Sequence, residues 1–436
     1  MIAEQNEELL VGLDDIDWAS LDHAYGSADD VPRQLRQVCG DDEAASEDAW
    51  RHLFSNIFHQ GTRYAASPYA VPFLSRIAIA GPQPTRPTAL LMLTRLAVDW
   101  HDEYDLPGGI DTVAWRAAAA EFTPEKMVAW YDEELAVEED PDKRQTLEEV
   151  RAYCAAGGLI DSRASALPSY DAVRAELPAL FCLLKDPDPE IRTRTAYLLA
   201  WFPEDGAHIV PELLAQLDRE DDARATATAL VAAGLVGDDA LVDRFRPWLA
   251  APDPLVQWGA ATALARLVTV GPDTSSGDDA LVAQVLTVLM GAAAAPMSVL
   301  GVDFNDGNLR GYAARSLAPL AVHAPDAILS VIVNAFGGLP DHETRAAITE
   351  ALTAALTGAF PSAADQTGVP FIDLGAGRQH ILRFVAEHGP WGQYGTPIEH
   401  RLRELGLPDN QPALCAYTQT VVDTSSVWNS KTEGQP

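Results

Sequence analysis

Apolar residues in the middle of the chain recur at the spacing of helices, and short polar turns separate one apolar helix from the next. The clearest example is LLKDPDPEIRTRTAYLLAWF at residues 183–202, where Asp-Pro-Asp-Pro lies between two apolar segments. Asp caps the free N–H groups at the start of a helix, and Pro fits its first turn. The small side chain of Ala196 lets two helices approach closely. The pattern predicts two antiparallel helices joined by a capped turn.

The same sequence motif recurs along the chain. Its marker position is occupied by Arg192, Arg224, Gln257, Arg310 and Arg345, with spacings of 32, 33, 53 and 35 residues. An earlier copy surrounds Arg86, and the wide gap before Arg310 is typical of a repeat that carries an insertion. Helix pairs at this period cannot bury their apolar faces alone and must stack. We therefore predict an all-α solenoid of stacked antiparallel helix pairs that forms a superhelix.

The repeated phrase resembles that of the HEAT family, including its phycobilisome-lyase-like bacterial branch, in which Asp-x-x-Val-Arg opens the second helix. The resemblance covers residues 170–357 and, more loosely, 49–100. In that family the marker arginine usually pairs with acids of neighbouring repeats. The resemblance therefore implies a structural ladder made by Arg86, Arg192, Arg224, Arg310 and Arg345. Gln257 departs from the pattern and interrupts the expected ladder.

The N-terminal region is similar to a group of actinobacterial HEAT-repeat proteins. The residues that carry this resemblance are Asp17-Trp18, His23 to Ala28, Val31-Pro32, Asn56, His59 to Thr62, Tyr64 and Ala70 to Leu74. Many proteins of this group have no assigned activity, and some acidic HEAT-like proteins are regarded as immunity partners of toxins. The resemblance thus implies the shape of the protein more than its activity.

The expected organisation has five segments. They are an acidic N-terminal cap at 1–48, the first HEAT-like helix pairs at 49–111, a long helical pair linking the blocks at 112–169, the HEAT repeat array at 170–357, and a C-terminal cap with a flexible tail at 358–436. Within the third segment we expect two long helices, with Thr123 as an N-cap and Gly157-Gly158 at the end of the second helix.

The net charge of the chain limits the classes of molecule that it can bind. The chain has 30 Lys+Arg against 64 Asp+Glu, a formal net charge of -34. Such a surface repels phosphate, so we expect no nucleic-acid partner, whereas it attracts a basic protein. Four scattered cysteines without CxxC, and an acidic N-terminus unlike a signal peptide, predict a cytoplasmic protein. The uncharged stretch 280–302 is rich in alanine and predicts a buried helix pair, so we expect no membrane contact.

No motif predicts catalysis, a cofactor or a metal. The segment FIDLGAG at 371–377 resembles a nucleotide-type methyltransferase loop but lacks the third glycine, which favours a helix connection. His52 and His59 are seven residues apart, but no third ligand lies at a spacing typical of a metal site. The pairs His342-Glu343 and Glu399-His400 resemble the His-Glu pairs of HEAT-type iron hydroxylases, but two pairs are too few for such a site. We therefore expect no enzyme activity.

The charge is unevenly distributed. Residues 1–160 hold 30 acids and 12 bases, yet 49–98 contains no acid and has Arg51, Arg63, Arg76, Arg86 and Arg95. We call residues 49–98 the acid-free island. It predicts a partner-binding groove, or alternatively an inner helix pair whose arginines pair with carboxylates of the flanking segments. The predicted partner-binding residues are Trp18, Tyr25, His59, Gln60, Tyr64, Trp100, Asp102 and Glu103.

Together these features predict an intracellular inhibitor or immunity-type protein that binds a basic toxin or enzyme. A scaffold for protein or peptide assembly is the alternative, with a groove lined by Trp18, Tyr25, Tyr64, Trp100 and Trp115. A nucleic-acid-modifying or S-adenosylmethionine-dependent enzyme is a remote alternative that depends on FIDLGAG alone.

Overall fold

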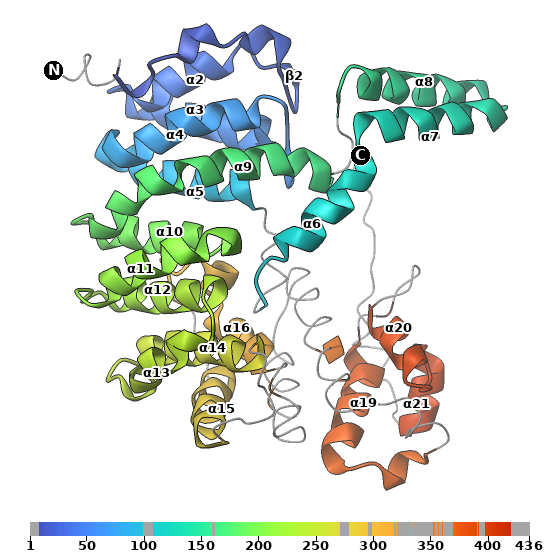
Figure 1. Cartoon of the computed structure of the whole chain (residues 1–436). Coiled ribbons are helices and arrows are strands. Elements are labelled where there is room, and N and C mark those ends of the chain that lie inside the picture. Colours follow the sequence, from blue (N-terminus) through green and yellow to red (C-terminus); the bar gives the residue numbers. More distant parts are fainter. Residues whose placement is uncertain are drawn as a thin grey trace. The chain divides into compact units, whose positions relative to one another are not determined.

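The fold is all-α, as predicted. The computed structural model describes residues 8–98, 108–158, 162–270, 279–294, 299–317, 369–389, 391 and 397–419, with single positions between 320 and 360. Regular structure in these residues is helical, apart from two antiparallel hairpins made of two-residue strands (Figure 1).

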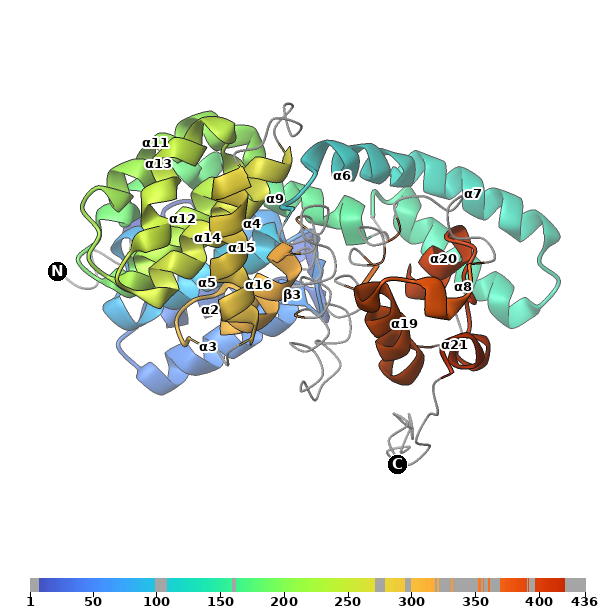
Figure 2. The ribbon, with the colours of Figure 1, turned by 90° about the horizontal axis from the view of Figure 1, so that it is seen from below.

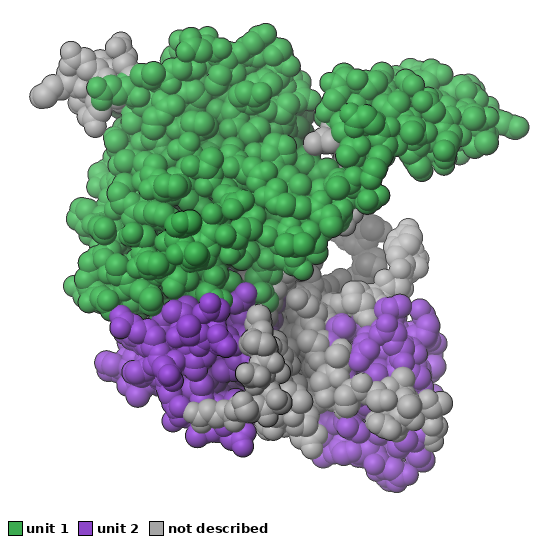
Figure 3. Space-filling view, viewed as in Figure 1, with its two compact units in different colours: residues 1–237, 301–303 green, residues 238–300, 304–436 purple. Residues whose placement is uncertain are grey.

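The chain divides into two compact units. Unit 1 comprises residues 1–237 and 301–303, and unit 2 comprises 238–300 and 304–436 (Figure 3). The predicted repeat array at 170–357 thus contributes residues to both units.

Unit 1 begins with short elements and two hairpins. Its first part contains η1 (Leu13–Asp15), η2 (Trp18–Ser20), β1 (Asp22–His23), β2 (Gly26–Ser27), α2 (Val31–Val38), α3 (Glu43–Asn56), β3 (Phe58–His59), β4 (Thr62–Arg63), α4 (Ser67–Ala80), η3 (Gln83–Thr85) and α5 (Arg86–Ala97). Its second part contains α6 (Thr112–Ala119), η5 (Ala120–Phe122), α7 (Pro124–Val137), α8 (Pro141–Ala155), α9 (Ser162–Leu180), η6 (Phe181–Lys185), α10 (Pro189–Leu199), η7 (Pro203–Asp205), α11 (Gly206–Leu217) and α12 (Ala223–Val236).

Polar caps decide where many of these helices begin. In the Asp-Pro-Asp-Pro turn, the Asp188 side chain accepts a hydrogen bond from the backbone N–H of Glu190, and Pro189 is the first residue of α10. Asp222 caps α12 in the same way. The predicted helix–capped turn–helix unit is therefore confirmed at this position.

In unit 1, helices from before and after the α6–α8 segment pack against one another. Helix α4 packs against α5 and α9, α5 against α10, and α10 and α11 both against α12 (Figure 1). Their interface buries large side chains such as Tyr170, Trp201 and Phe202 completely. Burial of this aromatic area stabilises the packing of the unit.

The segment from 112 to 155 differs from the expected pair of long helices. Helix α6 ends after Ala119, and Thr123 caps a separate helix α7 by accepting from the N–H of Lys126. Helices α7 and α8 then form a hairpin, packed mainly on each other, in which Tyr131 and Cys154 are the buried residues. The predicted N-cap at Thr123 is therefore confirmed, and it divides the first expected helix into α6 and α7.

Unit 2 is also helical. It contains η8 (Asp239–Leu241), α13 (Val242–Phe245), η9 (Arg246–Ala250), α14 (Pro254–Val270), α15 (Asp279–Ala294), η11 (Phe304–Gly307), α16 (Leu309–Leu317), η14 (Phe371–Asp373), α19 (Ala376–His388), α20 (Pro397–Glu404) and α21 (Gln411–Thr418). Helices α14, α15 and α16 pack against one another (Figure 2). Within the described residues, no helix is long and apolar enough to cross a membrane.

The FIDLGAG segment leads into a helix. Phe371–Asp373 forms a single turn of 3-10 helix, and α19 begins at Ala376 directly after Gly375. A nucleotide-type loop would follow a strand. In the described residues the segment leads from a 3-10 turn into α19, and what precedes residue 369 lies outside the described residues.

Candidate functional site

Two small hairpins of unit 1 gather Tyr25, His59, Gln60 and Tyr64, which are four of the five predicted partner-binding residues that the structure describes. Strand β1 pairs with β2, and β3 pairs with β4. In the turn between β3 and β4, Gln60 and Gly61 have φ values of 48° and 84°. Left-handed backbone at both central positions is what a type I′ hairpin turn requires. Gln60 therefore has a backbone role in this turn, and its side chain is exposed.

The two hairpins are joined to each other and to α4. The N–H of Ala24 donates to the carbonyl of Asn56 at 3.0 Å, and the N–H of Ala66 donates to the carbonyl of Asp22 at 3.0 Å. The ring of Tyr25 contacts that of His59 edge-on, with centroids 5.5 Å apart. These contacts hold the hairpins as one surface.

A buried chain of polar side chains lies beneath this surface. Nδ1 of His23 accepts from the N–H of Tyr25, so Nε2 carries the proton and donates to Asp30 at 3.0 Å. Gln34 donates to Asp30 at 2.7 Å, and Asn56 donates to Gln34 at 3.0 Å. Buried polar groups that satisfy one another in this way fix a single arrangement of the elements that carry them.

The predicted residues differ in their exposure. Tyr25 is 68% exposed, and His59 and Tyr64 are half-buried at the hairpins. Trp18 instead lies in the core, 4% exposed, where its Nε1 donates to the carbonyl of Leu13. Trp115 is half-buried. The remaining predicted residues, Trp100, Asp102 and Glu103, lie outside the described residues.

Beside the hairpins, unit 1 has a cavity of about 850 Å³. Its wall includes Asp22 of β1, Tyr64 after β4, Tyr69 of α4, and Tyr153 with Gly158 at the end of α8. We call this feature the tyrosine cavity. Its volume lies within the roughly 300–1,000 Å³ range of sites for small organic ligands.

The position of Tyr153 depends on the way in which α8 ends. The N–H of Gly157 donates to the carbonyl of Cys154, and the N–H of Gly158 donates to the carbonyl of Tyr153. This is the Schellman arrangement, in which the residue corresponding to Gly157 is left-handed, and its φ is 92°. The Tyr153 ring lies so close to Gly158 that a Cβ at that glycine would overlap it.

Asp22 is the acidic group of the tyrosine cavity. Its Oδ1 accepts from the N–H of Ala65 at 3.3 Å. Burial raises the pKa of the Tyr153 hydroxyl, and the charge of Asp22 raises it further. Burial likewise raises the pKa of Tyr64, with a smaller contribution from Asp22.

The cationic side chain that lines the tyrosine cavity is engaged elsewhere. Arg63 is 2% exposed, and its guanidinium donates to the carbonyl oxygens of Gly61, Leu96 and Ala97. In the part of the chain that the structure describes, no Lys, Arg or His forms an ion pair with Asp22.

Sequence reasoning did not identify Asp22, Tyr69, Tyr153 or Gly158 as site residues. The available signal was the Gly157-Gly158 helix end, which locates the end of α8 but does not show what packs there. Because residues 22, 64–69 and 153–158 are far apart along the chain, their proximity is a property of the tertiary structure.

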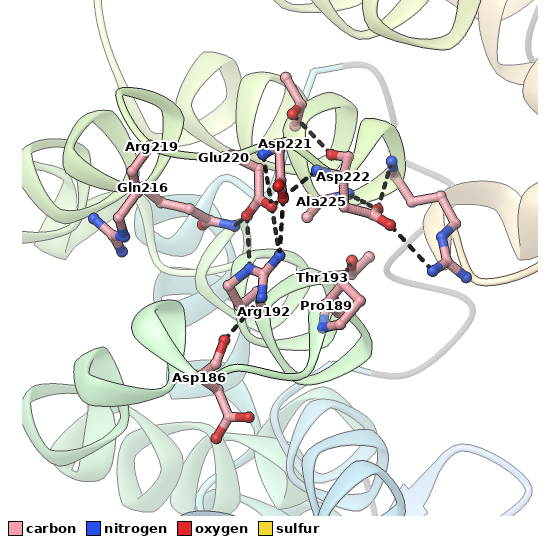
Figure 4. Close-up of polar contacts among 12 residues, drawn as sticks. Asp186, Pro189, Arg192, Thr193, Gln216, Arg219, Glu220, Asp221, Asp222 and Ala225 are labelled. Atoms are coloured by element: carbon pink, nitrogen blue, oxygen red, sulfur yellow. Dashed lines mark hydrogen bonds and ion pairs between the residues drawn. The ribbon is translucent and has the colours of Figure 1, made fainter.

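The predicted arginine ladder is represented most fully at Arg192 (Figure 4). Its Nε and Nη2 donate to the two carboxylate oxygens of Glu220 at 2.8 and 2.6 Å, and its Nη1 donates to the carbonyl of Asp186 at 2.8 Å. The Glu220 side chain is 1% exposed and also accepts from Gln216 at 3.0 Å. Burial opposes ionisation of Glu220, but these bonds outweigh it and hold its pKa below the usual value.

The other marker residues differ. Arg86 pairs with Asp186, and both side chains are largely buried. Arg224 pairs with Asp222 only two residues earlier, whereas Arg310 donates to the carbonyl of Ala293. Gln257, which occupies the marker position in place of arginine, donates to the carbonyl of Ala251. Arg345 lies outside the described residues.

The arginines of the acid-free island have varied partners. Arg51 pairs with Asp48, and Arg86 with Asp186, so these two satisfy carboxylates outside the island. Arg76 donates to the carbonyl oxygens of Leu9 and Val11.

The histidine candidates that the structure describes have separate partners. Nδ1 of His52 contacts the carbonyl of Asp48, and His400 pairs with Glu404. Among the residues described, no group of three or more His, Cys, Asp or Glu side chains could hold a metal ion. His342 and Glu343 lie outside the described residues.

Comparison with known proteins yields little similarity. No protein-family model matches the chain, and no curated protein matches it. Three chains of solved structures match, among them an engineered protein whose crystal structure is known. That protein has 17% sequence identity, and the match covers 90% of this chain and 99% of the engineered one, with a TM-score of 0.29.

Proposed function

We propose that the protein is a non-enzymatic, HEAT-like binding protein of the cytoplasm whose partner is a basic protein. In this proposal it inhibits a basic enzyme or toxin in the manner of an immunity protein. The observation that carries the proposal is the acidic, aromatic tyrosine cavity on a chain with a net charge of -34.

The chemistry of the site supports a protein partner. Tyrosines give large contact area with a polar tip, and they are enriched where proteins recognise one another. Tyr25, Tyr69 and Tyr153 are all exposed at or near the cavity. A large negative charge accelerates encounter with a cationic partner and rejects anionic ones.

The first experiment captures partners on the tagged full-length protein from its native cell extract, at low salt and at about 0.5 M salt, where surface charges are strongly screened. A captured basic enzyme is then purified, and its activity is titrated with this protein. We expect activity to fall to a stoichiometric end point at low salt and to recover at high salt.

Two results contradict the proposal in different ways. A captured enzyme that stays fully active at saturation is bound without inhibition, as by a scaffold. Binding that is equally tight at both salt concentrations removes charge complementarity from the explanation.

A further inference from the structure

We propose that the tyrosine cavity binds an arginine side chain presented by an extended segment of the partner. This inference rests on the proposed function, because it names the group of a basic partner that the site would recognise. The argument depends on a carboxylate with a fixed position, on aromatic walls and on the space available.

The carboxylate is the recognition group. The Oδ1 of Asp22 accepts from the N–H of Ala65, and the main chain of Asp22 is fixed because its carbonyl accepts from the N–H of Ala66. Within the described ranges no cationic side chain neutralises it, and the nearby Arg63 directs its guanidinium to buried carbonyls. A carboxylate held in this way attracts an external cation.

The walls favour arginine over lysine. Tyr64 and Tyr153 line the same cavity as Asp22. The charge of Asp22 raises the pKa of both hydroxyls. A guanidinium is planar, stacks on aromatic faces and donates two parallel bonds to a carboxylate, whereas an ammonium is a strongly hydrated point charge. Flat aromatic walls beside a carboxylate therefore match the guanidinium better.

The space suits a peptide chain around that side chain. The volume of about 850 Å³ exceeds what one side chain occupies. Gly26 and Gly157 line it, and a Cβ at either glycine would meet no atom within 4 Å. Backbone from a partner can therefore approach these glycines closely.

The test uses short labelled peptides and the full-length protein. One peptide carries a single arginine flanked by glycine and serine, and two matched peptides carry citrulline or lysine instead. Citrulline has nearly the shape of arginine but no charge. Fluorescence anisotropy at low salt measures the affinity of each peptide for the protein and for the variants D22N and D29N.

We expect the arginine peptide to bind at least about tenfold more tightly than the citrulline peptide, with the lysine peptide in between. Asp22→Asn keeps an oxygen for the Ala65 N–H and should abolish most of this preference. Asp29→Asn removes the same charge from an exposed residue of the same region that does not line the cavity, and it should preserve the preference.

Four results overturn the inference, the first three of which concern relative affinities. These three are equal binding of the arginine and citrulline peptides, equal binding of the arginine and lysine peptides, and an Asp29→Asn effect as large as that of Asp22→Asn. Absence of binding by all three peptides at millimolar concentration also overturns it. Each result leaves salt-dependent inhibition of a captured enzyme intact, so failure here is distinct from failure of the proposed function.

Discussion

The aromatic ring of Tyr153 lies against Gly158, five residues further along the chain, at a distance that only a residue without Cβ permits. The same glycine donates its N–H to the Tyr153 carbonyl and ends α8. A single helix end therefore both terminates the hairpin and sets one wall of the tyrosine cavity.

Gly158→Ala should displace the Tyr153 ring and weaken binding of the arginine peptide. In a Tyr153→Ala background the same substitution should have little further effect, because the overlapping ring is absent. Anisotropy titrations of the two single variants and the double variant measure this coupling. Additive effects would show that Gly158 acts through something other than Tyr153.

Arg192→Met should destabilise unit 1 by about 3–5 kcal/mol, because it leaves Glu220 charged and buried without its partner. Asp221→Asn is the matched control. Its side chain is 98% exposed and 3.9 Å from Arg192, so we expect a change within about 0.5 kcal/mol. Urea unfolding followed by circular dichroism measures both, and equal losses would refute a special role for the buried pair.

Stability should fall in acid because of the same network. The pKa of Glu220 is held below its ordinary value of 4.5, since burial is outweighed by Arg192, Gln216 and a backbone N–H. A carboxyl with a lowered folded pKa stabilises the protein above pH 4.5, and this contribution is lost as the pH falls through the folded value. The urea midpoint should therefore decrease below pH 4.5, and less steeply in Glu220→Gln. A midpoint that rises in acid, or an unchanged slope in the variant, contradicts this assignment.

Gly206→Ala should destabilise the packing of α11 on α12. A Cβ at Gly206 would overlap the carbonyl of Val236, so the two backbones must separate, at a cost of about 1–3 kcal/mol. Gly291→Ala is the contrasting control, because its Cβ would meet no atom within 4 Å in α15. We expect that control to stabilise its helix by up to about 1 kcal/mol. Thermal unfolding distinguishes the two, and a neutral Gly206→Ala would contradict the close approach.

Local features were predictable from sequence where one residue type determines them. Asp188 and Pro189 specify a capped helix start, and Gly157-Gly158 specify a helix end, and both are as expected. Trp18 was predicted to bind a partner but lies in the core, since a single aromatic residue carries no signal of which way it faces. The tyrosine cavity depends on three distant segments that meet through tertiary packing, and no local pattern encodes that meeting.

Because Cys154 is buried in the hairpin of α7 and α8, the rate at which its thiol is labelled reports how often this hairpin opens. Its thiol is inaccessible, and burial raises its pKa, so a thiol reagent can reach it only after the two helices separate. Cys182 is exposed and should be labelled at once, whereas Cys39 in the N-terminal core, whose pKa burial raises to about 11, should be labelled only when unit 1 unfolds. Comparing the three labelling rates in the native protein thus distinguishes opening of the α7–α8 hairpin from global unfolding. No cysteine has to be introduced for this measurement.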